Sequence, residues 1–514
     1  MFSTIISGAV QGMSAYLAEV EVDVATGLPG FHMVGYLSGE VREARERVQV
    51  ALRNTGFELR PMKITVNLSP ADVRKEGTGF DLPVAVGMLE SLGYFGEEAA
   101  ARTLFLGELG LDGEIKPVKG VLPIVREAAS KGVKTCIVPK KNVLEGAAIP
   151  GVDVRGAHHI EQILRFLQAK GSGREEILPA VKVDLQALFC REAREEEDFR
   201  EVRGQEAAKR AAEIAAAGFH NLLMSGPPGA GKSMIAKRIA GILPPISMEE
   251  SLEVSAIYSV AGRLKESQSL LTKRPFQSPH HNITQAALVG GSTIPQPGMI
   301  SLSHRGVLFL DELPEFERSV LDSMRQPLED HQVQIARLHG NVSYPAHFML
   351  ICAMNPCACG YFPDKNRCVC KETEVKRYLG KVSGPILDRI DLCTEILPVK
   401  MTQLKGGEEE SSGQIRERVL RARYAQEQRF QGSAYHFNSE IRAADMEKYC
   451  RLNPAEQKLM ERAYEGMGLS ARAYHKILKV ARTIADLAGE EEIRAEQLTE
   501  ALYYRTAENR LGRK

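Results

Sequence analysis

The spacing of apolar residues predicts an α/β unit in the first third of the chain. Residues 16–24 and 63–68 alternate apolar and polar positions, which is typical of strands with one buried face. Residues 40–54 instead repeat apolar residues at helical spacing, and the predicted buried face consists of Val41, Ala44, Val48 and Ala51.

The pattern changes after about residue 200. Short, mainly apolar runs at 221–225, 307–310 and 348–353 predict strands that are buried on both faces, as in a parallel sheet. A glycine loop and a helix over 232–242 follow the first of them. The last hundred residues have helical periodicity and few strand signals, with helices expected at 416–430, 455–464, 471–487 and 495–505.

Two polar, glycine-containing stretches, at 170–180 and 405–413, indicate boundaries between these parts. We therefore expect three domains and two linkers. The expected order is domain 1–170, linker 171–195, domain 196–404, linker 405–413 and domain 414–514.

Composition narrows the class of protein. The 514 residues include 66 Lys and Arg and 66 Asp and Glu, so the formal net charge is zero. This balance excludes a polycation and an acidic disordered chain, and any nucleic-acid surface must be local. No run approaches the length of a membrane span, and the first basic residue, Arg42, comes too late for a signal peptide. A cytoplasmic protein without membrane contact is expected.

Residues 226–233 match the phosphate-loop pattern G-x-x-x-x-G-K-[ST]. Glycines let backbone N–H groups turn toward phosphates, and the following helix adds positive charge at its N-terminus. An accidental glycine-rich turn would not need the strand before it and the helix after it. The predicted ligands of ATP are Gly226, Pro227, Pro228, Gly229, Ala230, Gly231, Lys232 and Ser233.

Acidic and amide residues follow the next two strands. Asp311 and Glu312 end the run 307–310, and Asn355 follows the run 348–353. We expect Ser233 and Asp311 to hold Mg²⁺, Glu312 to activate water, and Asn355 to bind the γ-phosphate or that water. Solvated acids at a strand end, and a turn asparagine before Pro356, are the alternative interpretations.

Long motifs at 226–233, 274–281, 304–312, 383–391 and 470–487 give the chain a family resemblance. It resembles AAA+ ATPases of the magnesium-chelatase-like group, and within that group the YifB/ComM family, over essentially its whole length. The resemblance implies an α/β fold, with an AAA+ P-loop core and a C-terminal helical lid. An α/β domain similar to the Lon protease domain (ribosomal S5 domain 2-like) would precede the core.

The same resemblance implies a homo-hexameric ring with ATP between subunits. Arg389 matches an arginine finger offered to a neighbour, and Arg472 matches a sensor that contacts the γ-phosphate. A salt bridge to Asp388 or Asp391, and a solvated helix arginine, are the respective alternatives.

The segment 244–303 matches an insertion that projects into the ring pore in relatives. Lys273, His280 and His281 would meet DNA there, and simple packing of the insertion is the alternative.

The N-terminal likeness to the Lon protease domain rests on residues 106–118 and 129–140. Proteolysis by that fold needs a serine and a lysine. The alignment places Leu122 at the lysine position and Gly79 near the serine position, so a non-proteolytic domain is expected.

Cysteines are concentrated between residues 352 and 393, where six of the nine lie. The pattern C-x-C-x8-C-x-C offers four thiolates, which suit tetrahedral Zn²⁺, although the pairs are closer than usual in zinc sites. Reduced free thiols or a labile disulfide are the alternatives. The predicted ligands are Cys357, Cys359, Cys368 and Cys370.

Direct signals for nucleic acid are weak. Residues 414–430 contain five arginines and two glutamates, which describes either a DNA-binding face or a solvated helix. DNA, branched or single-stranded, is therefore a partner implied by resemblance, since ComM-type proteins are implicated in branch migration during natural transformation. The resulting hypothesis is a hexameric, ATP-hydrolysing DNA helicase. A metal-insertion subunit, a protein-remodelling or regulatory ATPase and a nucleotide-gated scaffold are the alternatives.

Overall fold

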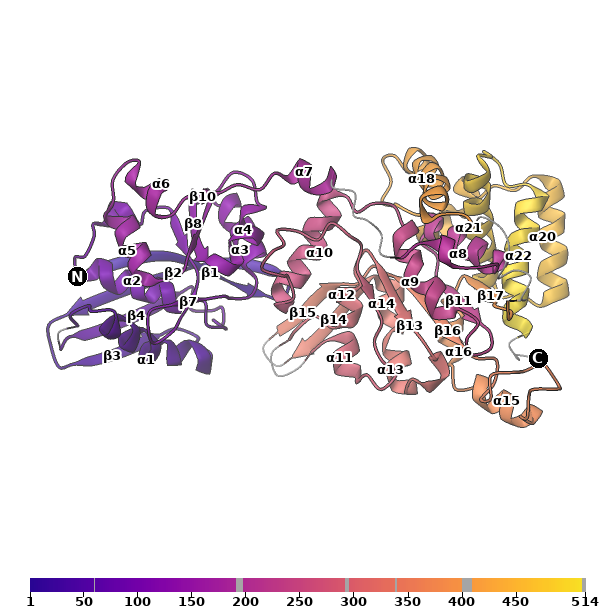
Figure 1. Cartoon of the computed structure of the whole chain (residues 1–514), viewed down its shortest axis with the longest axis horizontal. Coiled ribbons are helices and arrows are strands. Elements are labelled where there is room, and N and C mark those ends of the chain that lie inside the picture. The colour runs from indigo at the N-terminus through magenta and orange to yellow at the C-terminus, as the bar shows by residue number, and fades with distance from the viewer. Residues whose placement is uncertain (60, 191–196, 292–294, 338–339, 400–408, 511–514) are drawn as a thin grey trace.

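The computed structural model describes residues 1–59, 61–190, 197–291, 295–337, 340–399 and 409–510 (Figure 1). The expected linker residues 191–195 and 405–408, and the domain ends 196, 400–404 and 511–514, lie outside these ranges. The molecule is elongated, with the first sheet at one end and the C-terminal helices at the other. None of the described helices is long and apolar enough to cross a membrane.

Residues 1–181, here called the N-terminal unit, form a mixed sheet in the order β10-β9-β8-β5-β1-β2-β4-β3. The strands are β1 (Phe2–Gln11), β2 (Ser14–Ala25), β3 (Gly30–Val34), β4 (Lys63–Ser69), β5 (Thr103–Phe105), β8 (Thr135–Pro139), β9 (Asp153–Ala157) and β10 (Ala180–Val181). A small hairpin pairs β6 (Glu108–Leu109) with β7 (Ile115–Lys116).

The helices of the N-terminal unit cover this sheet. They are α1 (Gly39–Asn54), α2 (Asp81–Ser91), α3 (Val121–Ser130), α4 (Val143–Ala147), α5 (Ile160–Gln168) and α6 (Gly173–Ile177). The predicted apolar face of α1 is confirmed, because Val41, Ala44, Val48 and Ala51 are all fully buried. The two predicted strands are also confirmed, as parts of β2 and β4.

The segment expected to begin the first linker belongs instead to the sheet. β10 pairs antiparallel with β9, and Arg155 of β9 forms an ion pair of 2.6 Å with Glu175 of α6. Leu178, which follows α6, is buried. The glycines and charged residues of this segment are typical of a linker. Cross-strand pairing and one ion pair nevertheless hold the segment against the sheet. Helix α7 (Leu185–Cys190) follows.

Residues 197–399, here called the core, contain a parallel sheet in the order β12-β13-β16-β11-β17. Its strands are β11 (Leu222–Ser225), β12 (Phe276–Gln277), β13 (Val307–Leu310), β16 (Met349–Met354) and β17 (Leu392–Glu395). Every residue of β11, β13 and β16 is buried, as the uniformly apolar runs predict. This arrangement is consistent with a P-loop core of the AAA+ type.

Helices cover both faces of the core sheet. The helices of the core are α8 (Glu206–Gly218), α9 (Lys232–Ile242), α10 (Met248–Ala261), α11 (Gln285–Val289), α12 (Met299–Leu302), α13 (Arg318–Ser323), α14 (Arg325–Asp330), α15 (Glu372–Leu379) and α16 (Gly384–Leu387). The hairpin of β14 (Gln332–Arg337) and β15 (Gly340–Pro345) packs on the face opposite α8 and α9, in the same apolar cluster as Leu223 and Leu308.

The C-terminal helical region, residues 409–510, shares one apolar cluster with α8, α9 and the core sheet. Its helices are α18 (Ser412–Arg429), α19 (Met446–Tyr449), α20 (Pro454–Met467), α21 (Ala471–Ala488) and α22 (Ala495–Arg510). The four helices predicted there from periodicity are confirmed.

The predicted insertion, residues 244–303, joins the core to the N-terminal unit. Ala256 of α10 packs in one cluster with Leu122 and Val125 of α3. The Ser259 carbonyl oxygen accepts a hydrogen bond of 3.0 Å from the Gly120 N–H, and its Oγ accepts one of 3.4 Å from the Leu122 N–H. At least this part of the insertion is therefore a packed junction.

A largely buried carboxylate ties the C-terminal helices to the core sheet. Asp391, directly before β17, forms an ion pair of 3.1 Å with Lys476 of α21 and accepts a hydrogen bond of 2.9 Å from the Asn221 N–H. Burial alone raises the pKa of Asp391, but Lys476 and His220 outweigh this effect and hold the pKa well below its usual range. Asp391 is therefore ionised in the folded protein at neutral pH.

We predict that Asp391→Asn lowers the free energy of unfolding by about 3 kcal/mol, because it removes the carboxylate charge that pairs with the partly buried Lys476 ammonium. Since folding depresses the Asp391 pKa, this contribution is present at neutral pH and is lost as the pH falls below about 4. Denaturation by urea at pH 7 measures the change. The control, Glu161→Gln, removes an exposed i,i+4 pair with Arg165 and should cost less than about 0.5 kcal/mol. Equal midpoints for both variants would contradict the prediction.

Candidate functional site

The phosphate loop connects β11 to α9 with a backbone that requires glycine. Gly229 and Gly231 have φ angles of +75° and +94°, in the left-handed region. Gly226 is constrained differently, because a Cβ atom there would overlap the carbonyl oxygen of Ile396, just after β17. The close approach of β17 therefore fixes where the loop begins.

Lys232 is held by the loop itself. Its Nζ donates hydrogen bonds to the carbonyl oxygens of Gly226 (2.6 Å) and Pro227 (3.0 Å), and to Oδ1 of Asn355 (3.0 Å). Burial lowers the pKa of Lys232, against the opposing effects of Asp311 and Glu312. The buried Lys232 ammonium donates its hydrogen bonds to uncharged oxygens. Phosphate oxygens are charged and therefore stronger acceptors, so they can replace these partners.

Ser233 and Asp311 are already in contact. The Ser233 hydroxyl donates a hydrogen bond of 2.6 Å to Oδ2 of Asp311, although the two residues come from different strand ends. The other oxygen of Asp311 accepts the Glu312 N–H at 2.9 Å. A hydroxyl and a carboxylate so placed have the oxygen chemistry that Mg²⁺ prefers.

Glu312 has a strained backbone and a histidine neighbour. Its φ angle is +53°, which is unusual for a residue with a side chain and is typical of functional sites. His281 Nδ1 lies 3.3 Å from a Glu312 carboxylate oxygen. His281, which was predicted to meet DNA, therefore lies beside the predicted catalytic acid. The other two residues of that prediction, Lys273 and His280, are exposed.

Asn355 reaches the same group of residues from β16. Besides its bond to Lys232, its backbone lies against the hydroxyl of Tyr378 on α15. The carboxyl ends of β11, β13 and β16 therefore bring Lys232, Ser233, Asp311, Glu312 and Asn355 to one edge of the sheet, as the sequence predicts.

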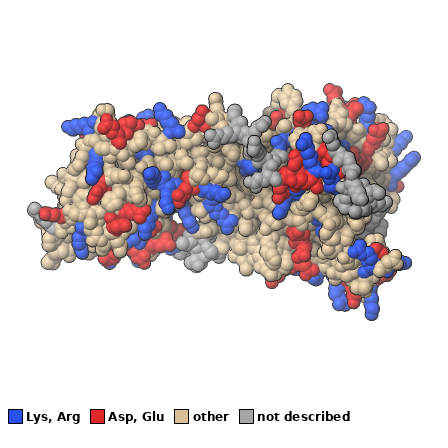
Figure 2. Space-filling model, in the orientation of Figure 1, with Lys and Arg blue, Asp and Glu red and all other residues tan. Residues whose placement is uncertain are grey.

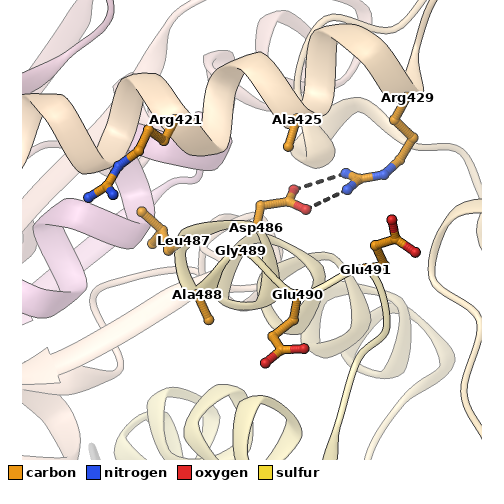
Figure 3. Close-up of a pocket in the computed structure, with 9 residues that line it drawn as sticks. All are labelled: Arg421, Ala425, Arg429, Asp486, Leu487, Ala488, Gly489, Glu490 and Glu491. Carbon is orange, nitrogen blue, oxygen red and sulfur yellow. Dashed lines mark hydrogen bonds and ion pairs between the residues drawn. The ribbon is translucent and has the colours of Figure 1, made fainter.

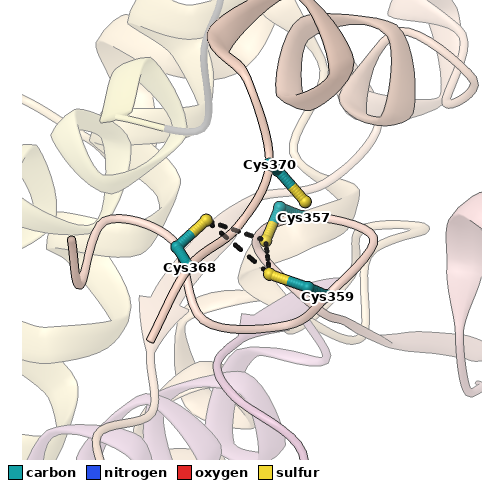
Figure 4. A group of neighbouring side chains, drawn as sticks. All are labelled: Cys357, Cys359, Cys368 and Cys370. Atoms are coloured by element: carbon teal, nitrogen blue, oxygen red, sulfur yellow. Dashed lines mark hydrogen bonds between the residues drawn. The ribbon is translucent and has the colours of Figure 1, made fainter. Parts of the chain in front are cut away.

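The four cysteines that follow Asn355 form a cluster (Figure 4). Cys357 Sγ lies 3.3 Å from Cys359 Sγ and 3.8 Å from Cys368 Sγ, and Cys359 and Cys368 are 3.6 Å apart. All four sulfur atoms, that of Cys370 included, lie within 4.8 Å of one another. The pKa of Cys359 is lowered to about 6, first by a hydrogen bond from the Tyr361 backbone.

Arg389 and Arg472 lie at the opposite edge of the sheet. β11 and β17 run parallel with Leu222 opposite Leu392, so Arg389 precedes β17 at the amino edge, whereas the phosphate loop leaves the carboxyl edge. Four strand residues separate the two edges by about 13 Å. The structure does not bring either arginine to the phosphate loop of its own chain.

Both arginines share one carboxylate on α14. Arg389 lies 2.5 Å and Arg472 3.6 Å from the same Glu329 oxygen. The ion pair that the described residues show for Arg389 is with Glu329. The Arg389 side chain is 10% exposed and that of Arg472 is 67% exposed.

Comparisons with known proteins agree along the whole chain. The model described as "Magnesium chelatase, subunit ChlI" matches residues 198–404, and models for ChlI and for its C-terminal part match 20–142 and 409–505. The Competence protein ComM of Haemophilus influenzae is 41% identical over 98% of this chain and 97% of its own length. YifB of Escherichia coli K12 is 41% identical over 99% and 98% of the two chains. An uncharacterized Mycobacterium tuberculosis H37Rv protein is 39% identical over 97% of each.

The chain belongs to the magnesium-chelatase-like YifB/ComM family. The family match covers the phosphate loop, the acidic strand end and both arginines. An AAA+ type ATPase follows from this membership.

The sequence motifs did not identify several residues that contact the phosphate loop or the residues around it. Gln205 donates hydrogen bonds to the carbonyl oxygens of Ala230 (3.1 Å) and Leu397 (2.7 Å), which joins the phosphate loop to the end of β17. Glu329, Tyr378 and Gly360 were missed as well. Each acts through tertiary contact alone; only the positive φ angle of Gln205 (+63°) and Gly360 (+86°) marks a special backbone.

The arginines of α18, for which a DNA-binding face and a solvated helix were the two interpretations, mostly have partners inside the chain. Arg418 pairs with Glu213 and Glu410, Arg429 with Asp486, and Arg423 stacks on Phe437 at 4.0 Å. Arg416 donates to the Gly241 carbonyl oxygen. Arg421 is exposed and points away from the Arg429–Asp486 pair, in a cavity of about 500 Å³ (Figure 3).

The two positions compared with a protease pair carry no such chemistry. Leu122 is fully buried against α10, and the Gly79 carbonyl oxygen accepts the Gly107 N–H at 3.1 Å. The cavity beside them, about 290 Å³, is lined by the exposed Lys119, Lys141 and Lys265.

We predict that Gly226→Ala raises the dissociation constant for ADP at least tenfold, since the added methyl group displaces the loop from Ile396. Gly229→Ala is the matched control: its Cβ would meet open space, so only backbone strain of about 1 kcal/mol weakens binding. Titration with a fluorescent ADP analogue compares them. Weaker binding by Gly229→Ala than by Gly226→Ala would contradict this account.

Proposed function

We propose that this chain is the ATP-hydrolysing subunit of a homo-hexameric DNA helicase that promotes branch migration in transformation or recombination. The observation that carries the ATPase part is the convergence of Lys232, Ser233, Asp311, Glu312 and Asn355 at one sheet edge. The helicase part rests on similarity to a competence protein. We place its work in the cytoplasm.

The site residues divide the chemistry among them. Lys232 and the N–H groups of residues 229–231 bind the phosphates, and Ser233 and Asp311 hold Mg²⁺, which supplies neutralising charge when bound. Glu312 accepts a proton from the attacking water at its carboxylate. Asn355 orients that water or the γ-phosphate from the end of β16.

A second copy is part of the proposal because the chain carries its arginines at the wrong edge for its own nucleotide. A neighbour that presents Arg389 and Arg472 to this phosphate loop would complete the site with charge for the transition state. Glu329 holds both side chains together in the single chain. We propose that they act as one unit on the next subunit, in a ring of six.

For DNA we propose contact at the junction of the N-terminal unit and the core. Lys116, Lys119, Lys140 and Lys141 come from the N-terminal unit, and Lys265 comes from the segment after α10. All five are exposed, although Lys141 also forms an ion pair of 3.3 Å with Glu266, and Figure 2 shows basic side chains near this junction with acidic ones among them. Backbone phosphates need only such charge, without base-reading residues.

ATP and Mg²⁺ are the cofactors that this proposal requires, and Zn²⁺ at the four cysteines is a third. We propose that the N-terminal unit has a fold similar to the Lon protease domain. It would contact DNA or partner proteins and would not be a protease.

A metal-insertion motor is the second candidate, because the matching family models are described by the ChlI subunit of magnesium chelatase. It differs from the first in one measurable respect: its ATPase activity would be indifferent to DNA.

We predict that mixing two inactive variants restores ATPase activity. Lys232→Ala lacks a working phosphate loop and Arg389→Ala lacks the arginine for its neighbour, so in random rings about a quarter of the junctions combine two intact halves. A mixture as inactive as each variant alone would refute action between subunits. Arg318→Ala, which loses only an exposed i,i+4 pair, should be fully active alone.

We predict that single-stranded DNA or a four-way junction stimulates ATP turnover at low salt, and that Glu312→Gln abolishes this turnover while still binding ATP. Removing Lys119 and Lys265 together should weaken DNA binding and reduce the slope of log affinity against log salt by about 1.4 to 1.8. The control removes Lys131 and Lys134, two exposed lysines on the same unit outside the cavity. Turnover unaffected by DNA, without junction migration, would favour the metal-insertion motor.

A further inference from the structure

The cysteine cluster and the phosphate loop touch each other through Gly360 and Pro228. A Cβ atom on Gly360 would lie 2.5 Å from Pro228 Cδ and 2.8 Å from Pro228 Cγ, so the backbone of the cysteine loop rests directly on the proline ring. Gly360 has a φ angle of +86°. Only glycine combines this conformation with this closeness. A displacement of residues 357–370 would therefore reach the residues that surround the phosphates.

Three of the four sulfur atoms are spaced as in a mononuclear metal site, and that of Cys370 lies within 4.8 Å of them. In a tetrahedral Zn²⁺ site with Zn–S bonds of about 2.3 Å, neighbouring sulfur atoms are about 3.8 Å apart. The separations of 3.3, 3.6 and 3.8 Å among Cys357, Cys359 and Cys368 are close to this value. They are also well above the about 2.05 Å of a disulfide.

Hydrogen bonds and one stacking contact shape the loop between the two cysteine pairs. The Asp364 carbonyl oxygen accepts the N–H groups of Arg367 (3.1 Å) and Cys368 (2.7 Å). Arg367 stacks on the Tyr361 ring at 4.1 Å. The Phe362 N–H donates to Cys357 Sγ at 3.4 Å, which fixes one sulfur in the turn that contains Gly360.

Both ends of the cysteine loop lead into the nucleotide site. Asn355, which binds Lys232, lies two residues before Cys357. After Cys370 the chain enters α15, whose Tyr378 lies against the Asn355 backbone. A metal ion that joins Cys357 and Cys359 to Cys368 and Cys370 would therefore close a ring of chain around the side of the phosphate loop.

We infer that Zn²⁺ bound by Cys357, Cys359, Cys368 and Cys370 is a structural brace that holds Gly360 against Pro228 and thereby sets the affinity of the phosphate loop for nucleotide. This inference rests on the proposed binding of ATP at residues 226–233. It goes beyond that proposal because it makes nucleotide affinity depend on a second metal, distant from the Mg²⁺ ligands in sequence.

The test measures zinc content and nucleotide affinity in the same sample of the full chain. Protein purified without added zinc should contain about one Zn²⁺ per chain by elemental analysis. Removing the ion with a chelator selective for zinc, in excess Mg²⁺, should raise the dissociation constant of a fluorescent ADP analogue at least fivefold. Adding Zn²⁺ back should restore it.

Three variants separate the site from the brace. Cys368→Ser should lose zinc and bind ADP as weakly as the stripped protein. Gly360→Ala should retain zinc but bind ADP weakly, because its methyl group presses on Pro228. Cys450→Ala, which removes a buried thiol from the C-terminal region, should change neither quantity. Thermal melting monitors folding in each case.

Each remaining outcome has one meaning. Protein with four reactive thiols and no zinc, or with iron in its place, overturns the zinc site. Stripped protein that binds ADP with unchanged affinity overturns the brace. Zinc-loaded protein that binds no nucleotide refutes the proposed function and the brace with it, while its zinc content still supports the metal site.

Discussion

The parallel pairing of β11 between β16 and β17 is the constraint on which the rest of the structure depends. Because all three strands point the same way, their carboxyl ends deliver the phosphate loop and Asn355 to one edge, while Asp391 and Arg389 remain at the other. The pairing also brings the Ile396 carbonyl so close to residue 226 that only glycine can occupy it. A shift of β17 by one residue would change the loop, the buried carboxylate and the arginine together.

Ion pairs in this protein connect the core to the C-terminal helices and connect those helices to one another. Asp391 joins the core to α21, Arg429 and Asp486 join two C-terminal helices, and Glu329 gathers arginines from the core and from α21. The pairs with largely buried carboxylates, at Asp391 and Asp486, are weak sources of net stability but strongly penalise any arrangement that separates them. They favour one relative placement of core and C-terminal helices, which a hydrophobic cluster alone would define less sharply.

Local pattern predicted most elements and the phosphate-binding residues, because strands buried on both faces, helical periodicity and a phosphate loop each leave a signal within about ten residues. What it could not predict depends on contacts between distant segments. The linker-like residues 171–181 became a sheet edge through Arg155 and Glu175. Most arginines of the basic helix α18 pair with residues inside the chain. His281 lies beside Glu312 because the segment 244–303 folds back onto the core. Charge and glycine content describe a segment, whereas its partners come from the whole fold.

The separation of phosphate loop and arginine pair on opposite edges of one sheet has a geometric consequence. If the arginine pair of one copy acts at the phosphate loop of the next, as proposed, each copy offers unlike surfaces to its two neighbours, and contact between copies is head-to-tail. Contacts of that kind do not stop at two: they continue until rotation closes them, or they run on as a filament. In the proposed ring, the helices that pack on the sheet would set the angle between successive copies, and that angle would determine whether the last copy meets the first.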